Sequence, residues 1–188
     1  MANTCIDYCN DDPLGEIEVL GCGSDPLGGQ SAGVIFECLH DTTDYSNGAQ
    51  VLADIAAGKA HLVERCSFEI PAASAVTQDS LVPCESSRVV NYDRTANYVN
   101  PNVTAVNVAT HDQIFSGRKF GALLLWNCAS ADTDQEKCLL ITTPVTAQGS
   151  LIAPRTNTEF LRFEGTFNWR TKSNPQWINA PAGVFNQG

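Results

Sequence analysis

The sequence predicts a mainly β protein, either an antiparallel β-sandwich or an open barrel, with one or two short helices and extended terminal arms. Segment 158–170 provides the strongest evidence, because apolar and polar side chains alternate along it. The apolar positions are Leu161, Phe163, Phe167 and Trp169. Strict alternation is typical of a long strand with one buried face, since successive side chains leave opposite faces of the pleat. Other strand-sized apolar runs precede it, and helix-start signals are few, which together favour a sheet protein.

Two strands are predicted in the first part of the chain, over 33–39 and 60–70. We expect four side chains of the second strand to share one face: Leu62, Cys66, Phe68 and Ile70. Pro71 ends this strand, and residues 72–83 are predicted to form a loop.

A short helix is predicted between these strands, over 49–57. Segment 44–47 provides an N-cap and Gly58 a C-cap. We expect the apolar face of the helix to contain Leu52, Ile55 and Ala56.

Residues 88–99 alternate again and form the next predicted strand, which is interrupted by Pro101. Segment 103–108 is interpreted as its continuation. Thr110 and Gln113 have the spacing of a capping box, which predicts a second short helix that runs to Arg118.

A hairpin is predicted from strands 121–129 and 137–143, joined by the polar loop 130–136. With Cys128 opposite Cys138, Trp126 would face Leu140 and Leu124 would face Thr142. That register keeps Leu124, Trp126 and Leu140 on one face. Residues 144–157 are predicted to connect this hairpin to the long closing strand.

Three regions are therefore expected. Residues 1–30 form a cysteine-rich, turn-rich N-terminal arm, in which the motif Cys-x-x-Asp-Pro-Leu-Gly occurs twice, from Cys9 and from Cys22. Residues 31–173 form the β-sandwich or barrel domain, and residues 174–188 form a loose, Pro-rich C-terminal tail.

The chain has eight cysteines, and disulfides are the favoured interpretation of them. The favoured pair is Cys128 with Cys138 across the hairpin, followed by Cys66 with Cys84. The pairing of Cys5, Cys9, Cys22 and Cys38 stays open, and these four are also a candidate zinc set, although no Cys-x-x-Cys knuckle is present. Reduced, buried cysteine is the remaining alternative.

No catalytic or cofactor-binding residue is predicted. The three histidines, His40, His61 and His111, are scattered, and the chain has no nucleophile elbow, phosphate-binding glycine loop or HExxH helix. The acidic residues of the N-terminal arm lack the spacing of an EF-hand, so a solvated acidic face is favoured over a calcium site. We therefore expect a protein that is not an enzyme and that needs no cofactor.

The formal net charge of −10 argues against a protein that grips nucleic-acid phosphates, because such proteins cluster Lys and Arg. The N-terminus lacks the features of a signal peptide and no apolar run is long enough to span a bilayer, so we expect cytoplasmic synthesis and no membrane partner. Eight cysteines suit an oxidising compartment instead. A virion component, made in the cytoplasm and released from the cell, satisfies both expectations.

From Arg88 onward, the order of elements resembles that of phage tail tube proteins, particularly those of tailed phages of Bacteroidetes-type hosts. The segments that carry the resemblance are 87–99, 110–126, 137–143 and 160–170. They correspond to a long hairpin, a helix, a Leu-rich hairpin and a closing strand of alternating aromatics. The resemblance covers roughly the C-terminal hundred residues, and the cysteine-rich arm departs from it.

The resemblance implies a structural protein of the phage tail, assembled in the host cytoplasm. Its subunits would form rings, typically of six, which stack into an acidic channel that genomic DNA passes through without sequence-specific binding. The partners would be other copies of the chain and other virion proteins. Two alternatives stay open, a capsid decoration or other virion-surface module, and a disulfide-stapled secreted binding domain.

Overall fold

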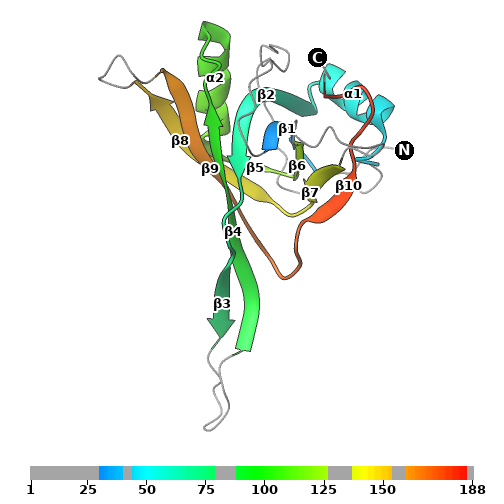
Figure 1. Ribbon diagram of the computed structural model, residues 1–188, viewed down its shortest axis with the longest axis vertical. Helices are drawn as coiled ribbons and strands as arrows, with labels where there is room; N and C mark the ends of the chain where they lie inside the picture. The colour runs from blue at the N-terminus through cyan, green and yellow to red at the C-terminus, as the bar shows by residue number, and fades with distance from the viewer. Residues whose placement is uncertain (1–29, 40–43, 79–87, 127–136, 154–159, 186–188) are drawn as a thin grey trace.

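The computed structural model describes residues 30–39, 44–78, 88–126, 137–153 and 160–185. Within these ranges, ten strands and two helices follow one another (Figure 1). They are β1 (Gln30–Phe36), α1 (Gly48–Ala56), β2 (Ala60–Glu69), β3 (Ser74–Gln78), β4 (Arg88–Asn100), α2 (Ala105–Ile114), β5 (Ser116–Phe120), β6 (Ala122–Trp126), β7 (Lys137–Ile141), β8 (Val145–Ile152), β9 (Arg162–Thr171) and β10 (Gln176–Asn179). The predicted mainly β class is confirmed.

All ten strands belong to one antiparallel sheet, with the order β10-β7-β6-β1-β2-β4-β9-β8-β5 and with β3 paired to β4. The sheet does not close into a barrel, because β10 and β5 end the order. It is strongly curved, however, since side chains from β7, near one end of the order, share a core cluster with side chains from β8 and β5 at the other end.

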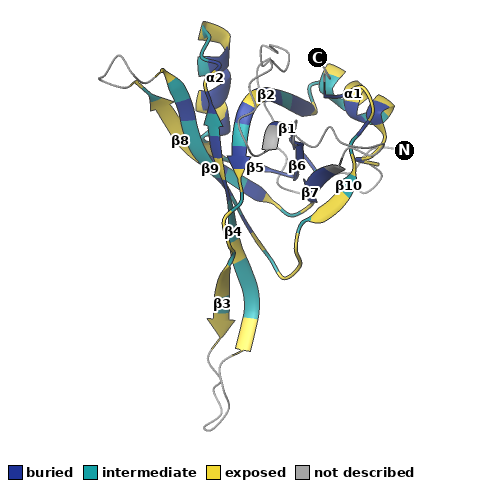
Figure 2. Ribbon diagram, in the orientation of Figure 1, coloured by how far each residue is buried: buried dark blue, intermediate teal, exposed yellow. Residues whose placement is uncertain are grey.

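Each face of the sheet carries its own apolar cluster. The inner cluster fills the concave side and includes Ile35, Phe68, Phe120, Phe163 and Phe167. The outer cluster lies on the other side of β1, β6 and β7 and includes Val34, Phe36, Val51, Leu124 and Trp126. Burial of apolar surface on both faces explains why β6, the segment Ala-Leu-Leu-Leu-Trp, is buried at every position (Figure 2).

Helix α1 is confirmed, and it begins and ends one residue earlier than the predicted range 49–57. The Asn47 side chain accepts hydrogen bonds from the backbone N–H groups of Ala49 and Gln50, and Gly58 follows the helix at φ +67°. The predicted buried face is confirmed for Ile55, which packs against the outer cluster, but not for Leu52 and Ala56, which are exposed. The buried residues of the helix are Gly48 and Val51.

The side chains of β2 do not share one face along the whole strand, contrary to the prediction. Leu62 packs against the outer cluster, whereas Cys66 and Phe68 belong to the inner one. Arg65, with φ +53°, lies between them, and the pairing of β2 with β1 shifts in the same region. This irregularity turns the second half of the strand over, as a β-bulge does.

Helix α2 starts earlier than predicted. Its N-cap is Thr104, whose hydroxyl accepts from the Asn107 N–H, so Thr110 lies inside the helix and 103–108 does not continue β4. The chain turns there because the Asn100 side chain accepts the Asn102 N–H, an Asx-type turn that ends the strand. The helix ends at Ile114, and Arg118 belongs to β5.

Two segments predicted as loops contain strands, β3 within 72–83 and β8 within 144–157. Most of their side chains are exposed or half-buried, so these strands do not need an apolar residue at every second position. The alternation that predicts a strand is therefore weak in both. Strand β8 pairs with β9 so that Gly149 lies opposite Gly165. The Phe115 ring packs over these two glycines, and a Cβ at Gly165 would come within 2.6 Å of it. Glycine at this pair is therefore a packing requirement.

The predicted hairpin is formed by β6 and β7, but its register differs by two residues. Trp126 lies opposite Cys138, and Leu124 lies opposite Leu140. A slip of two residues keeps every side chain on its own face, so Leu124, Trp126 and Leu140 share the outer cluster as expected. The connecting loop 130–136 lies outside the described residues.

The closing strand is confirmed as β9, with Phe163, Phe167 and Trp169 buried on its inner face. Leu161 precedes the strand. The predicted C-terminal tail is wrong in one respect, because β10 pairs with β7 and joins the sheet. Beyond it, the Phe185 ring stacks on Trp126 with centroids 5.1 Å apart. The C-terminal segment packs against the sheet, because Val184 and Phe185 belong to the outer cluster. Residues 1–29 of the predicted N-terminal arm lie outside the described residues.

Candidate assembly surfaces and buried polar sites

A two-stranded ribbon projects from the body of the molecule (Figure 1). It consists of β3 and residues 88–91 of β4, and we call it the β3–β4 arm. From Tyr92 onward β4 also pairs with β9, but residues 88–91 pair with β3 alone. Within the described residues, both long edges of the arm are therefore unpaired.

The surface of the arm is mostly accessible to solvent (Figure 2). Val89 is 49% exposed, and every described residue of the arm is exposed or half-buried. An isolated two-stranded ribbon is marginally stable in water, because few side chains are buried to offset the loss of chain entropy. Open strand edges on such a ribbon are typical sites for pairing with another chain.

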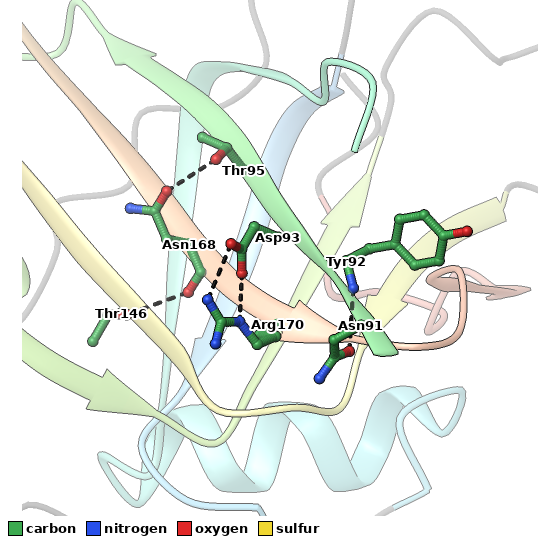
Figure 3. Close-up of polar contacts among 7 residues, drawn as sticks. All are labelled: Asn91, Tyr92, Asp93, Thr95, Thr146, Asn168 and Arg170. Atoms are coloured by element: carbon green, nitrogen blue, oxygen red, sulfur yellow. Dashed lines mark hydrogen bonds and ion pairs between the residues drawn. The ribbon is translucent and has the colours of Figure 1, made fainter. Parts of the chain in front are cut away.

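The base of the arm is fixed by polar pairs on the outer face of β4, β9 and β8 (Figure 3). Arg170 donates two hydrogen bonds to the carboxylate of Asp93, the residue opposite it. Thr95 donates to the Asn168 side chain at 3.0 Å, and Thr146 donates to the Asn168 carbonyl at 3.3 Å. These pairs hold three strands in register at the point where the arm leaves the body.

The hydrogen bonds between Asp93 and Arg170 shift the pKa of both groups. The bonds from Arg170 lower the pKa of Asp93, and the same bonds raise the pKa of Arg170. Both groups are accessible to solvent, so the pair gives orientation to the arm and only a small contribution to stability.

A closed ring of hydrogen bonds lies under α2. His111 Nδ1 is 2.8 Å from the Asn107 carbonyl, which can only accept, so Nδ1 carries the proton. Nε2 therefore accepts from the Tyr98 hydroxyl at 2.7 Å, and Asn100 donates to that hydroxyl at 2.9 Å. The Asn102 N–H donates to Asn100, and the Asn107 amide donates to the Asn102 carbonyl, which completes the ring.

This ring is completely buried. His111 is 0% exposed, and its imidazole stacks on Phe163 with centroids 3.8 Å apart and planes 4° apart. Burial lowers the pKa of His111, although its bond to the Asn107 carbonyl and the nearby Asp112 oppose this. Burial also raises the pKa of Tyr98 well above 10. A neutral, fully hydrogen-bonded Tyr–His pair without solvent contact holds α2 on the sheet, and the predicted helix residue His111 has this structural role.

A second buried polar group joins Glu37, which directly follows β1, to β2 and β5. His61 Nε2 lies 3.2 Å from one oxygen of Glu37, and Arg118 lies 3.8 Å from the other. Glu37 and His61 are both buried. The carboxylate thus has a cation beside it, as a buried charge requires. His40, the third histidine of the chain, lies outside the described residues.

The two predicted disulfides are not formed. Cys138 and Cys66 are both buried thiols, so the pairs with Cys128 and Cys84 are wrong, and these two partners lie outside the described residues. Cys138 lies opposite Trp126 in the outer cluster, and the Cys66 thiol lies 3.7 Å from the Val63 carbonyl. The two-residue register shift of the hairpin explains the first error.

Cys38 is disulfide-bonded, so it offers no thiolate to a metal ion. The other members of the candidate zinc set, Cys5, Cys9 and Cys22, lie outside the described residues. Among the residues that the structure describes, no group of three or more His, Cys, Asp or Glu side chains could hold a metal ion.

The acidity of the chain is unevenly distributed. Thirteen of the 21 acidic residues, but one of the 11 basic residues, lie outside the described ranges. The described framework therefore carries eight acidic and ten basic side chains. The net charge of −10 comes from the segments that join and precede the strands, above all from residues 1–29.

None of the described helices is long and apolar enough to cross a membrane. No protein-family model, no curated protein and no solved structure matches this chain.

Proposed function

We propose that this chain is a structural subunit that assembles with its own copies into rings, and that these rings stack into a phage tail tube. The observation that carries the proposal is the β3–β4 arm, a solvent-exposed ribbon with two open edges. Edge pairing between copies would satisfy the backbone groups of the arm. An arm that pairs with a different surface of the next copy makes a heterologous contact, which forms a ring when the rotation between successive copies closes.

The ends of the sheet support the same proposal. The order ends at β10 and β5, so two further strands offer an edge within the described residues. The exposed side chains include Trp177 on β10, at 62% exposure. Exposed aromatic side chains are enriched at protein interfaces. The formal net charge of −10 suits a channel that DNA passes through without sticking.

Electron microscopy of negatively stained purified protein tests the proposal. We expect rings or tubes of uniform bore, and size-exclusion chromatography should show large assemblies. A small closed oligomer would favour a capsid decoration or other virion-surface module. A monomer at high concentration would favour the secreted binding domain and would overturn the proposal.

A pair of matched variants identifies the surface. Val89→Lys places a charge on the arm and should abolish the assemblies, because charged edges oppose strand pairing. Leu52→Lys makes a similar change on α1, where the side chain is 43% exposed, and should leave them intact. Assembly by the Val89→Lys protein would show that the arm is not the contact.

A further inference from the structure

A pocket opens between β7, the end of β9 and the turn that leads to β10. Its cavity volume is about 30 Å³. It is lined by Leu140, Ile141, Thr142, Thr143, Trp169, Thr171, Ser173, Asn174, Pro175 and Gln176. None of these lining residues is charged, and most carry a hydroxyl, amide or indole group that can donate a hydrogen bond.

Donors without acceptors gather at this pocket. The indole N–H of Trp169 and the hydroxyl of Thr143 are buried and have no hydrogen-bond partner. Trp169 is 4% exposed, so its N–H is also shielded from bulk water. A buried donor without a partner is costly, at about 1–3 kcal/mol, and calls for an occupant that accepts hydrogen bonds.

A positive charge lies beside the same pocket. Arg94 is opposite Trp169 in the β4–β9 pairing, and it donates to the Asn174 side chain at 2.7 Å. Its Nε atom is buried and has no partner. The guanidinium stays charged in proteins, and it contacts a neutral amide and the Tyr92 ring, whose centroid is 5.6 Å away.

We propose that this pocket binds a carboxylate, held by the guanidinium of Arg94, the indole N–H of Trp169 and the hydroxyl of Thr143. A carboxylate only accepts hydrogen bonds and carries the opposite charge to Arg94, so it matches both features of the site. The group comes either from a free small carboxylate or from an Asp or Glu side chain of a second copy. The inference is separate from edge pairing, because it depends on side-chain donors of the pocket and not on the open strand edges of the β3–β4 arm.

Thermal unfolding at pH 7 tests the site, with sodium acetate as the probe and sodium chloride at equal ionic strength as the reference. We expect acetate to raise Tm along a saturable curve that chloride does not produce. Thr143→Val, Trp169→Phe and Arg94→Gln should each weaken the acetate effect about tenfold, because each removes a donor.

Trp126→Phe is the matched control. The Trp126 indole N–H is also buried and without a partner, but Trp126 does not line this pocket, so its variant should keep the full acetate effect. An equal rise with acetate and chloride would overturn the proposal and indicate a water-filled pocket. A saturable rise that survives in Thr143→Val and Trp169→Phe would also overturn it. Thr143→Val preserves side-chain shape, so the test stands even if Arg94→Gln fails to fold.

Size-exclusion chromatography with and without acetate separates the two sources. If an acidic side chain of a second copy fills the pocket, acetate should compete with it and shift the protein to smaller species. If a free carboxylate is the ligand, acetate should bind without a change in size. Rings that form while acetate has no specific effect would refute the pocket and leave the proposed function untouched.

Discussion

The two ends of β4 differ in pairing and burial. One end lies in the core of the fold, and the other projects into solvent as part of the β3–β4 arm. The last residues of β4, 96–100, are paired on the β9 side, and Ala96, Tyr98 and Asn100 are buried. Its first residues, 88–91, pair with β3 alone and are exposed or half-buried. Both halves have the same backbone conformation. They differ in neighbours, so we expect the buried half to set stability and the exposed half to set association.

His111→Ala should have the largest effect on stability. It removes the centre of the hydrogen-bonded ring, leaves the Tyr98 hydroxyl without the acceptor for its proton, and creates a cavity against Phe163. We expect a loss of about 3 kcal/mol in the free energy of unfolding, measured by urea denaturation. Asp112→Ala, on the exposed side of the same helix, is the control and should change little.

Tyr98→Phe tests the buried end of β4 itself. It keeps the ring but removes the hydroxyl, so Asn100 loses its acceptor and His111 Nε2 loses its donor. We expect a loss of about 2 kcal/mol in urea denaturation. A loss below about 0.5 kcal/mol would contradict the view that the hydrogen-bonded ring stabilises this half of the strand.

Acidification should weaken the same region. Burial lowers the folded-state pKa of His111 below its ordinary value of 6.5, so the unfolded chain binds the proton more readily. The contribution of the neutral imidazole is complete above about pH 6.5 and is lost as the pH falls towards the folded-state pKa, by up to about 1.4 kcal/mol per pH unit. Urea midpoints from pH 7 to pH 5 measure this slope. His111→Gln should flatten it, and an unchanged slope would assign it to other groups.

Asp93→Asn tests the base of the arm and should have a smaller effect. It removes the charge that receives two hydrogen bonds from Arg170, but both side chains are exposed and solvent screens the pair. We expect the urea midpoint to fall less than it does in Tyr98→Phe. High salt should reduce the difference between variant and parent, and a midpoint as low as that of His111→Ala would show that the arm and body are more strongly coupled.

Val89→Lys should have the smallest effect on stability. Val89 is half-exposed on the arm and does not belong to either apolar cluster. We expect the free energy of unfolding of the dissociated chain to change by less than about 0.5 kcal/mol. A large loss would mean that the arm packs against the body in solution, which would remove the contrast between the two halves of β4.

Local sequence patterns determined the elements whose signals are contained within one segment. The aromatic alternation of β9 and the Asn47 and Gly58 caps of α1 each predicted an element that the structure confirms. The apolar run of β6 likewise identified a buried strand. The predominance of β structure followed from these segments. In each case the side chains that reveal the element are also the ones that bury or cap it, so no distant residue is needed.

The tertiary structure alone decided the features that depend on distant partners. Strands β3 and β8 carry weak patterns and exist because β4 and β9 pair with them. The hairpin register depends on how Trp126 and Leu140 fill the outer cluster. The hydrogen-bonded ring around His111 connects residues on both sides of a turn whose position was predicted incorrectly from the sequence. The pocket donors Arg94, Thr143 and Trp169 lie far apart in the chain. They meet because antiparallel pairing and sheet curvature are properties of the whole fold, which no local window of sequence contains.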